Sequence, residues 1–189
     1  MVKLIGISGS LRQSSYNTAL LKSAAQLLSA NNSDATLDVQ TIKGIPLYDG
    51  DLEAIEGTPA AVKELKDRVA EADGIILATP EYNHSIPGAF KNAIDWLSRP
   101  QADIKKLFAN KPIALVGATP GGFGTTQAQE AWLPILQYLG TRPWFSSTMI
   151  VSQAHNVFDK EGKLVDENVK AKLQQFVLGF ADFTKSNLR

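Results

Sequence analysis

The sequence predicts an α/β fold in which helices cover both faces of one parallel β-sheet. Short apolar stretches alternate five times with longer stretches of helical periodicity, as successive strand–helix units require. The apolar stretches are rich in β-branched residues, which is typical of strands buried on both faces. Unusual loops rich in serine, proline or glycine follow three of these strands. With 189 residues, 44% of them hydrophobic, the chain can bury one full core.

Composition excludes several classes of protein. The 19 basic and 19 acidic residues balance, so nothing favours nucleic acid or a membrane surface as partner. There are no cysteines, which rules out disulfides and thiolate chemistry. The only histidines, His84 and His155, lie outside any metal-ligand spacing, so no metal site is expected. No apolar run reaches membrane-spanning length and no export segment precedes the first strand. We therefore expect one cytoplasmic domain over residues 1–189.

The first third of the chain contains two predicted strands and the first helix. Val2–Ile7 is a short apolar run and predicts a buried strand. Thr18–Ala30 carries apolar residues along one side and predicts a helix. Thr36–Ile42 alternates in polarity and predicts the second strand. A polar connection, 45–57, is expected to have no regular structure.

The middle of the chain adds two helices and one strand. Thr58 and Pro59 form a helix-start signal, and the helix is expected to run to about Ala72. The next strand is 75–79, and after a loop over 80–87 a helix is expected over 88–98.

The last third predicts two more strands and two more helices. Ile113–Ala118 is the fourth strand, followed by a glycine-rich turn and a helix over 125–139, in which Pro134 is expected to cause a bend or mark a break. Pro143–Val151 is the fifth strand, and the final helix begins near Asp166. Length and element count favour a flavodoxin-like, three-layer α/β/α sheet of order 2-1-3-4-5. Ligands of such sheets lie beyond the carboxyl ends of the strands, between the first and third.

The loop after the first strand has the composition of a phosphate site. Its hydroxyl and amide side chains can donate to phosphate oxygens, and Arg12 supplies its only full positive charge. The start of a helix adds unpaired N–H groups and the positive end of the helix dipole. Neither GxxxxGK[ST] nor GxGxxG is present, which disfavours nucleotide triphosphatases and dinucleotide Rossmann sites. The alternative is an ordinary serine-rich strand–helix loop.

Two further loops are expected at the same edge of the sheet. Thr79–Gly88 has a proline near each end, so we expect a stiff loop whose backbone can bind the edge of a planar heteroaromatic ring. Tyr82 or Asn83 could supply polar contacts to a flavin. The glycines of 121–124 permit close backbone approach from the other side.

Together these motifs resemble those of the NADPH-dependent FMN reductase family, which includes quinone, chromate and azo-dye reductases. The resemblance rests on Gly9-Ser10-Leu11-Arg12-x-x-Ser15-x-Asn17, on residues 80–96, and on Ile45-Pro46-Leu47-Tyr48. It implies a hydride relay from NADPH or NADH through FMN N5 to a planar acceptor, with no protein acid or base. It also implies a homodimer, possibly a homotetramer, with residues 88–96 on the interface helix.

The resemblance further implies which residues bind FMN. The phosphate would be held by Ser10, Arg12, Ser15 and Asn17, and the ring edge by Pro80, Glu81, Tyr82 and Asn83. Thr119 and the turn at Gly121 would help to close the ring site, and Tyr16 and Ser85 complete the set. The expected set is Ser10, Arg12, Ser15, Tyr16, Asn17, Pro80, Glu81, Tyr82, Asn83, Ser85, Thr119 and Gly121. The chain departs from many relatives at His84, where they often have tyrosine, and at Gln127, where they carry arginine. The physiological acceptor therefore stays open.

Two alternatives belong to other classes of protein. One is a flavodoxin-like electron carrier that binds FMN without turning over a nicotinamide. Such carriers tend to be acidic around the flavin, whereas this chain has no net charge. The other is a doubly wound scaffold that binds a phosphorylated metabolite and no flavin.

Overall fold

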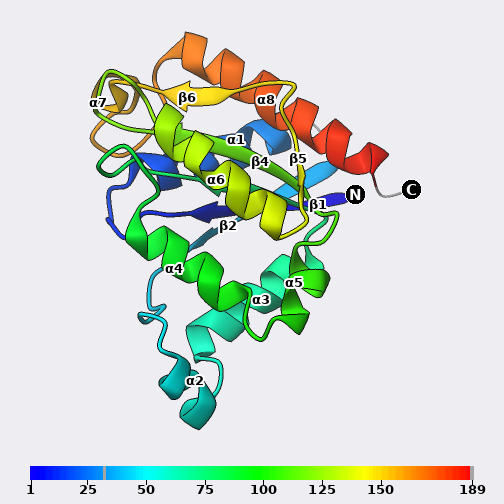
Figure 1. Cartoon of the computed structure of the whole chain (residues 1–189). Helices are drawn as coiled ribbons and strands as arrows, with labels where there is room; N and C mark the ends of the chain where they lie inside the picture. The colour runs from blue at the N-terminus through cyan, green and yellow to red at the C-terminus, as the bar shows by residue number, and fades with distance from the viewer. Residues whose placement is uncertain (32, 188–189) are drawn as a thin grey trace.

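A computed structural model describes residues 1–31 and 33–187. Asn32 and the last two residues of the expected 1–189 domain lie outside it. The strands form one sheet of order β2-β1-β3-β4-β5, and every paired strand runs parallel to its neighbour (Figure 1). This is the flavodoxin-like order that the sequence predicts.

The strands and helices alternate along the chain in the expected sequence. The strands are β1 Val2–Ser8, β2 Ala35–Thr41, β3 Gly74–Ala78, β4 Pro112–Ala118, β5 Arg142–Pro143 and β6 Met149–Val151. The helices are α1 Tyr16–Ala30, α2 Gly50–Glu56, α3 Ala60–Glu71, α4 Gly88–Leu97, α5 Ala102–Leu107, α6 Thr126–Tyr138, α7 Ala154–Val157 and α8 Glu167–Ser186.

Helices cover both faces of the sheet and bury a separate apolar cluster on each (Figure 1). Strand β1 shows why, because alternate side chains point to opposite faces. Val2 and Leu4 pack with α1 and α8, whereas Ile5 and Ile7 pack with α3, α4 and α6. The predicted three-layer arrangement is confirmed.

The strand register brings three carboxyl ends together. Ser8 at the end of β1 lies opposite Thr41 of β2 and Ala78 of β3, and Ala78 lies opposite Val116 of β4. Since neighbouring strands are about 4.8 Å apart, the loops that leave β1, β3 and β4 must lie side by side.

Local capping explains two helices that differ from the prediction. α1 begins at Tyr16, because the Ser15 hydroxyl accepts the N–H of Thr18 and caps the helix earlier than expected. The connection 45–57, expected to be irregular, contains α2. The Asp49 carboxylate caps that helix by accepting from the N–H of Asp51.

The predicted fifth strand, Pro143–Val151, is interrupted. It forms two short strands, β5 and β6, that both pair with β4. Between them the chain leaves the ladder, and the indole of Trp144 packs against Phe176 and Phe180 of α8, with ring centroids 5.1 and 5.7 Å apart. The short helices α5 and α7 were also not predicted, and α6 continues through Pro134 as one helix.

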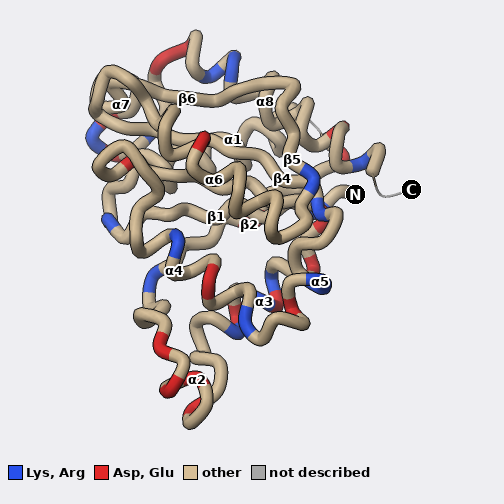
Figure 2. Tube along the Cα trace, viewed as in Figure 1, with Lys and Arg blue, Asp and Glu red and all other residues tan. Residues whose placement is uncertain are grey.

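Charge is spread over the chain rather than gathered in one element. Figure 2 shows basic and acidic residues interspersed along α3, α5 and α8. Among the described residues, no helix has both the length and the apolar character needed to cross a membrane.

Candidate functional site

The loop after β1 is held tightly against the sheet and α4. The N–H of Gly9 donates to the carbonyl of Ala78, 2.9 Å away, which continues the β1–β3 ladder by one residue. A Cβ at Gly9 would overlap the ring of Phe90, the first large buried side chain of α4. Only glycine lets the chain pass so close to this ring.

The start of α1 gathers hydrogen-bond donors at the end of this loop. Tyr16 and Asn17 are the first two residues of the helix, so their N–H groups have no intrahelical acceptor. Ser10 and Ser15 are buried, and Arg12 is exposed beside them. The Ser10 hydroxyl oxygen accepts the N–H of Arg12 at 3.3 Å, which fixes the turn and leaves the hydroxyl hydrogen for another acceptor.

The side chain of Asn17 joins the first loop to the end of β4. Its Nδ2 donates to the carbonyl of Ala118 at 2.9 Å, and its Oδ1 accepts the N–H of Ala118 at 3.0 Å. Both partners lie in the interior, where an unpaired polar group costs free energy. The amide that the family resemblance led us to expect at a phosphate therefore joins α1 to β4 in this structure.

Tyr16 also turns away from the loop. Its ring stacks on Phe158, with centroids 5.7 Å apart, so its side chain belongs to the packing between α1 and the segment before α8. Tyr16 therefore offers its backbone N–H, and not its side chain, at the start of α1.

The loop after β3 forms a tight two-residue hairpin turn. Tyr82 and Ser85 exchange both backbone hydrogen bonds at 3.1 Å. Between them, Asn83 and His84 have φ of 51° and 61°, which places both in the left-handed region, as in type I′ turns. Pro80 is buried, while Tyr82 to Ser85 are exposed. Besides the prolines from which we predicted a stiff loop, this turn adds a second source of rigidity.

Glu81 connects this hairpin to α6. Its carboxylate Oε2 accepts the N–H of Ala128, in the first turn of α6, at 2.9 Å, and its side chain is only 10% exposed. The other carboxylate oxygen lies 3.7 Å from Nδ1 of His84. A carboxylate at a helix N-terminus is favourable, because it satisfies an unpaired donor and complements the dipole. Glu81 therefore presents its backbone, and not its carboxylate, to the crevice.

Backbone hydrogen bonds hold the glycine-rich loop after β4 against β6 and the start of α7. The N–H of Thr119 donates to Val151, and the carbonyls of Thr119 and Gly121 accept from Ala154 and Gln153. Thr119 is half-buried, whereas Gly121 and Gly122 are exposed, and a Cβ at Gly122 would meet only open space. This loop is therefore fixed at its base and open at its tip.

Gly117, one residue before the end of β4, lies in a crowded place near the carboxyl end of the sheet. A Cβ there would lie 2.6 Å from the carbonyl oxygen of Thr79 and would overlap the Thr125 hydroxyl. Thr79 and Thr125 are both fully buried. Sequence reasoning used positions 79 and 125 only as the starts of a loop and a helix and gave Gly117 no role, because a glycine inside an apolar strand gives no sign of what packs against it.

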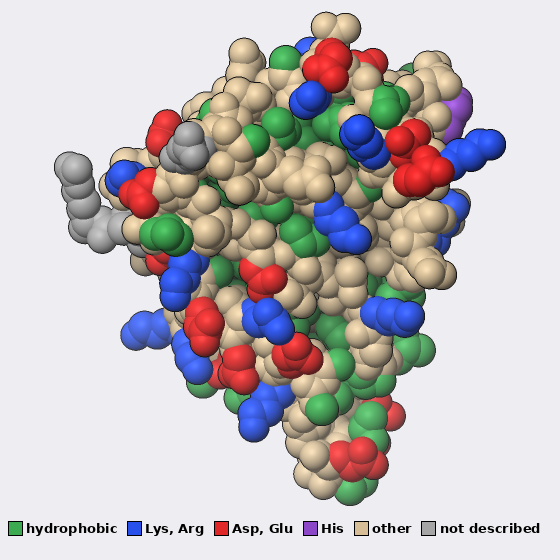
Figure 3. Space-filling model, turned by 180° about the vertical axis from the view of Figure 1, so that it is seen from behind, with side chains coloured by type: hydrophobic (Ala, Val, Ile, Leu, Met, Phe, Trp, Pro, Cys, Tyr) green, Lys and Arg blue, Asp and Glu red, His purple; other side chains and the backbone are tan. Residues whose placement is uncertain are grey.

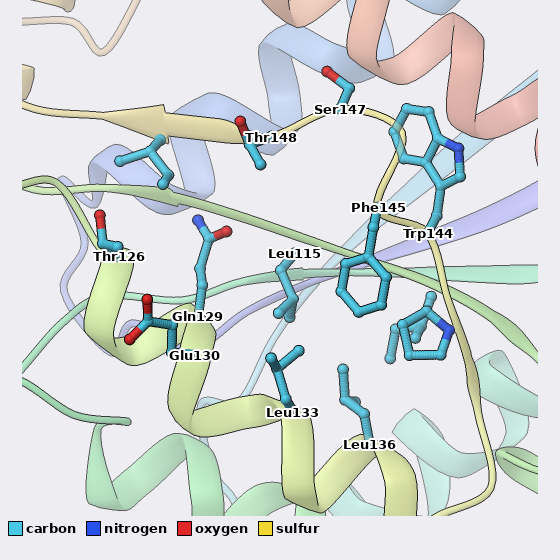
Figure 4. A pocket seen from close by; sticks show the side chains of 13 residues that line it. Leu115, Thr126, Gln129, Glu130, Leu133, Leu136, Trp144, Phe145, Ser147 and Thr148 are labelled. Atoms are coloured by element: carbon cyan, nitrogen blue, oxygen red, sulfur yellow. The ribbon is translucent and has the colours of Figure 1, made fainter.

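An apolar hollow of about 210 Å³ lies away from these loops, between α6 and the β5–β6 segment. Figure 4 shows Leu133 and Leu136 of α6 and Phe145 lining it. Its walls offer few polar groups, so it lacks the donors that a phosphate needs.

The three loops meet the requirements of FMN. The donor set at the start of α1 consists of free N–H groups, two hydroxyls and one guanidinium, which suits a phosphate monoester dianion. The hairpin and the glycine-rich loop offer preformed backbone edges at the same end of the sheet. The fold and this donor set together define a flavodoxin-like FMN protein.

Comparison with known proteins agrees. The family model described as NADPH-dependent FMN reductase matches residues 2–156, and the chain belongs to this family. It is accordingly an FMN-dependent NAD(P)H oxidoreductase.

Three similar proteins cover nearly the whole chain. An NAD(P)H-dependent FMN reductase of Pseudomonas aeruginosa is 41% identical over 174 residues, 92% of this chain and 90% of the relative. An NADPH:quinone oxidoreductase of Arabidopsis thaliana is 36% identical over 188 residues, 97% and 92% of the two chains. The solved structure of FerB, a flavoenzyme NAD(P)H:(acceptor) oxidoreductase of Paracoccus denitrificans, has a TM-score of 0.84 at 32% identity and covers 99% of each chain.

Proposed function

We propose that the chain reduces quinones with NAD(P)H, using FMN seated in the crevice between the three loops. The observation that supports this proposal is that two largely buried side chains link the segments that these loops join. Asn17, at the start of α1, is joined to β4, and Glu81 joins the hairpin to α6. An Arabidopsis relative named NADPH:quinone oxidoreductase supports the choice of quinone over azo dye, chromate or free flavin.

Each group of residues has a distinct part in this proposal. Ser10, Arg12 and Ser15, with the N–H groups of Tyr16 and Asn17, would hold the phosphate. The backbone of Pro80 to Ser85 and of Thr119 to Gly121 would border the ring. FMN, when bound, supplies the ring that relays hydride between NAD(P)H and acceptor. The chain itself orients flat molecules against that ring and needs no catalytic acid or base.

One spectroscopic experiment tests this function. The purified protein, supplied with FMN, is expected to show the visible absorbance of bound oxidised flavin. This absorbance should disappear when NADPH is added anaerobically and return when a quinone is added. A protein that holds FMN but is not bleached by NADPH or NADH would be a carrier. A protein that takes up no FMN would contradict the proposal entirely.

Replacement of Arg12 tests the phosphate end of the site. Because a charge-assisted hydrogen bond contributes about 1.5–3 kcal/mol, Arg12→Ala is expected to weaken FMN binding by roughly 10- to 100-fold. Fluorescence quenching during FMN titration measures this. Lys63→Ala, on the exposed side of α3, serves as the control and should leave the affinity unchanged. An Arg12→Ala variant with unchanged FMN affinity would remove Arg12 from the site.

We also propose that the whole chain acts as one FMN-binding domain and that it self-associates. Exposed apolar side chains support self-association. Leu133, Phe145 and Ile150 border the hollow of Figure 4 and are 40%, 68% and 38% exposed. Trp96 of α4, expected near the interface, lies in the core and donates to the carbonyl of Pro46.

A mass in solution of twice or four times 20.4 kDa is the expected result. The mass of one chain would contradict it.

A further inference from the structure

A hollow lined by three basic side chains lies beside the phosphate loop. It has a volume of about 390 Å³ and lies between the loop after β1, the first turns of α1 and the end of β2. Arg12 comes from the loop, Lys22 from α1 and Lys43 from the segment after β2. Thr18 and Lys22 are four residues apart, so they share one face of α1 and both line the hollow.

These three cations have no acidic neighbours in the hollow. No Asp or Glu is among its lining residues, and within the part of the chain that the structure describes none of the three forms an ion pair. The chain as a whole has no net charge, so the excess of positive charge in this hollow does not reflect the overall composition. Figure 3 shows that basic and acidic side chains are interspersed over much of the face seen from behind, as the balanced composition leads one to expect.

A neighbouring hollow differs from this one because it also contains acidic residues. It lies on the other side of the loop, has about 300 Å³, and also contains Arg12 and Lys22. It includes Asp159 and Glu161, which oppose the binding of an anion. Of the two hollows, only the one toward β2 is purely basic. It also contains hydroxyls, those of Ser10 and Thr41, that can donate to phosphate oxygens.

We propose that the hollow lined by Arg12, Lys22 and Lys43 binds the 2′-phosphate of NADPH and makes the enzyme prefer NADPH to NADH. This inference rests on the proposed function, because it needs the nicotinamide in the crevice. A phosphate monoester carries nearly two negative charges near neutral pH, which Lys22 and Lys43 complement while Arg12 lies between this hollow and the FMN phosphate.

The location of the hollow is compatible with an extended dinucleotide. The loops expected to border the ring follow β3 and β4, whereas the hollow lies at the end of β2, two strands from β3. Two strand spacings are about 10 Å. The nicotinamide and the adenosine of one molecule can therefore reach the two places, with its pyrophosphate crossing the exposed part of the loop near Arg12.

A binding measurement with two nucleotides tests the inference without catalysis. The full chain, with and without FMN, is titrated calorimetrically with 2′,5′-ADP and with 5′-AMP, which lacks the 2′-phosphate. We expect 2′,5′-ADP to bind at least roughly tenfold tighter. Lys22→Gln and Lys43→Gln should each reduce this preference several-fold, and the double variant should abolish it. Lys63→Gln is the matched control and should keep it.

Kinetics and FMN titration of the same variants distinguish the possible failures. The double variant is expected to lower the ratio of kcat/KM for NADPH to that for NADH by roughly tenfold or more, through KM for NADPH. If it instead weakens FMN binding, the hollow belongs to the FMN phosphate and the inference is wrong. Equal binding of both nucleotides by the unaltered chain also overturns it. A chain that binds no FMN but keeps the nucleotide preference would contradict the proposed function alone.

Discussion

A Gly117→Ala variant is expected to be destabilised by about 3 kcal/mol and to lose most of its FMN affinity. The added methyl group would lie 2.6 Å from the carbonyl oxygen of Thr79, a backbone atom that cannot move without displacing β3. Overpacking of a buried site costs about 1–3 kcal/mol, and here no flexible side chain can absorb the shift. Because Thr79 begins the hairpin loop, the displacement also changes one wall of the crevice.

Gly122→Ala provides the control for this experiment. Gly122 lies only five residues further on, and a Cβ there would touch nothing within 4 Å. Chemical unfolding and FMN titration of both variants should therefore distinguish the steric effect of the added methyl group at Gly117 from the general effect of replacing a glycine. If Gly117→Ala matched the unaltered protein in both measurements, the tight packing between β4, Thr79 and Thr125 would not exist in solution.

The second large effect is expected at Asn17. Asn17→Ala removes both bonds to Ala118 and leaves a buried N–H and C=O unpaired, at about 1–3 kcal/mol for each group. We expect the free energy of unfolding to fall by about 2–4 kcal/mol, as measured in urea. Asn156→Ala, at an exposed asparagine of α7, is the control and should change it little.

Asn17→Asp separates the clamp from the phosphate site. The carboxylate can still accept from the N–H of Ala118, but its other oxygen would face the carbonyl of Ala118 and repel it. The dipole of α1 would favour the carboxylate by only about 0.3–1 kcal/mol, which is too little to offset this. The new charge also lies where the FMN phosphate is expected. We therefore expect Asn17→Asp to lower FMN affinity more than Asn17→Ala, and the reverse order would contradict this position for the phosphate.

Sequence reasoning reached the fold because the fold depends on periodicity. The buried strands read as apolar runs, and the helices between them showed one apolar side, so the layers and the order 2-1-3-4-5 followed. Helices and strand ends that depend on the contacts of a single side chain were harder to predict. The Asp49 cap creates α2, and the Trp144 indole packs on α8 where the predicted fifth strand is interrupted.

The candidate site was predictable in its loops but not in the directions of its side chains. Serines, prolines and glycines indicated where the three loops were, since these residues act through the local backbone. Whether the amide of Asn17 and the carboxylate of Glu81 face a ligand or another loop depends on residues about 101 and 47 positions away. Lys22 and Lys43 likewise come together only through the pairing of β2 with β1.

The bond from Glu81 to Ala128 has a consequence for the enzyme's cycle. Because one carboxylate joins the hairpin to the first turn of α6, separating these two segments would cost a hydrogen bond to a charged group, about 1.5–3 kcal/mol. In the proposed function, nicotinamide and acceptor then meet a backbone edge that is already in place when each of them arrives. Little conformational entropy is lost at each exchange, and turnover would be paced by the departure of one flat molecule before the next arrives.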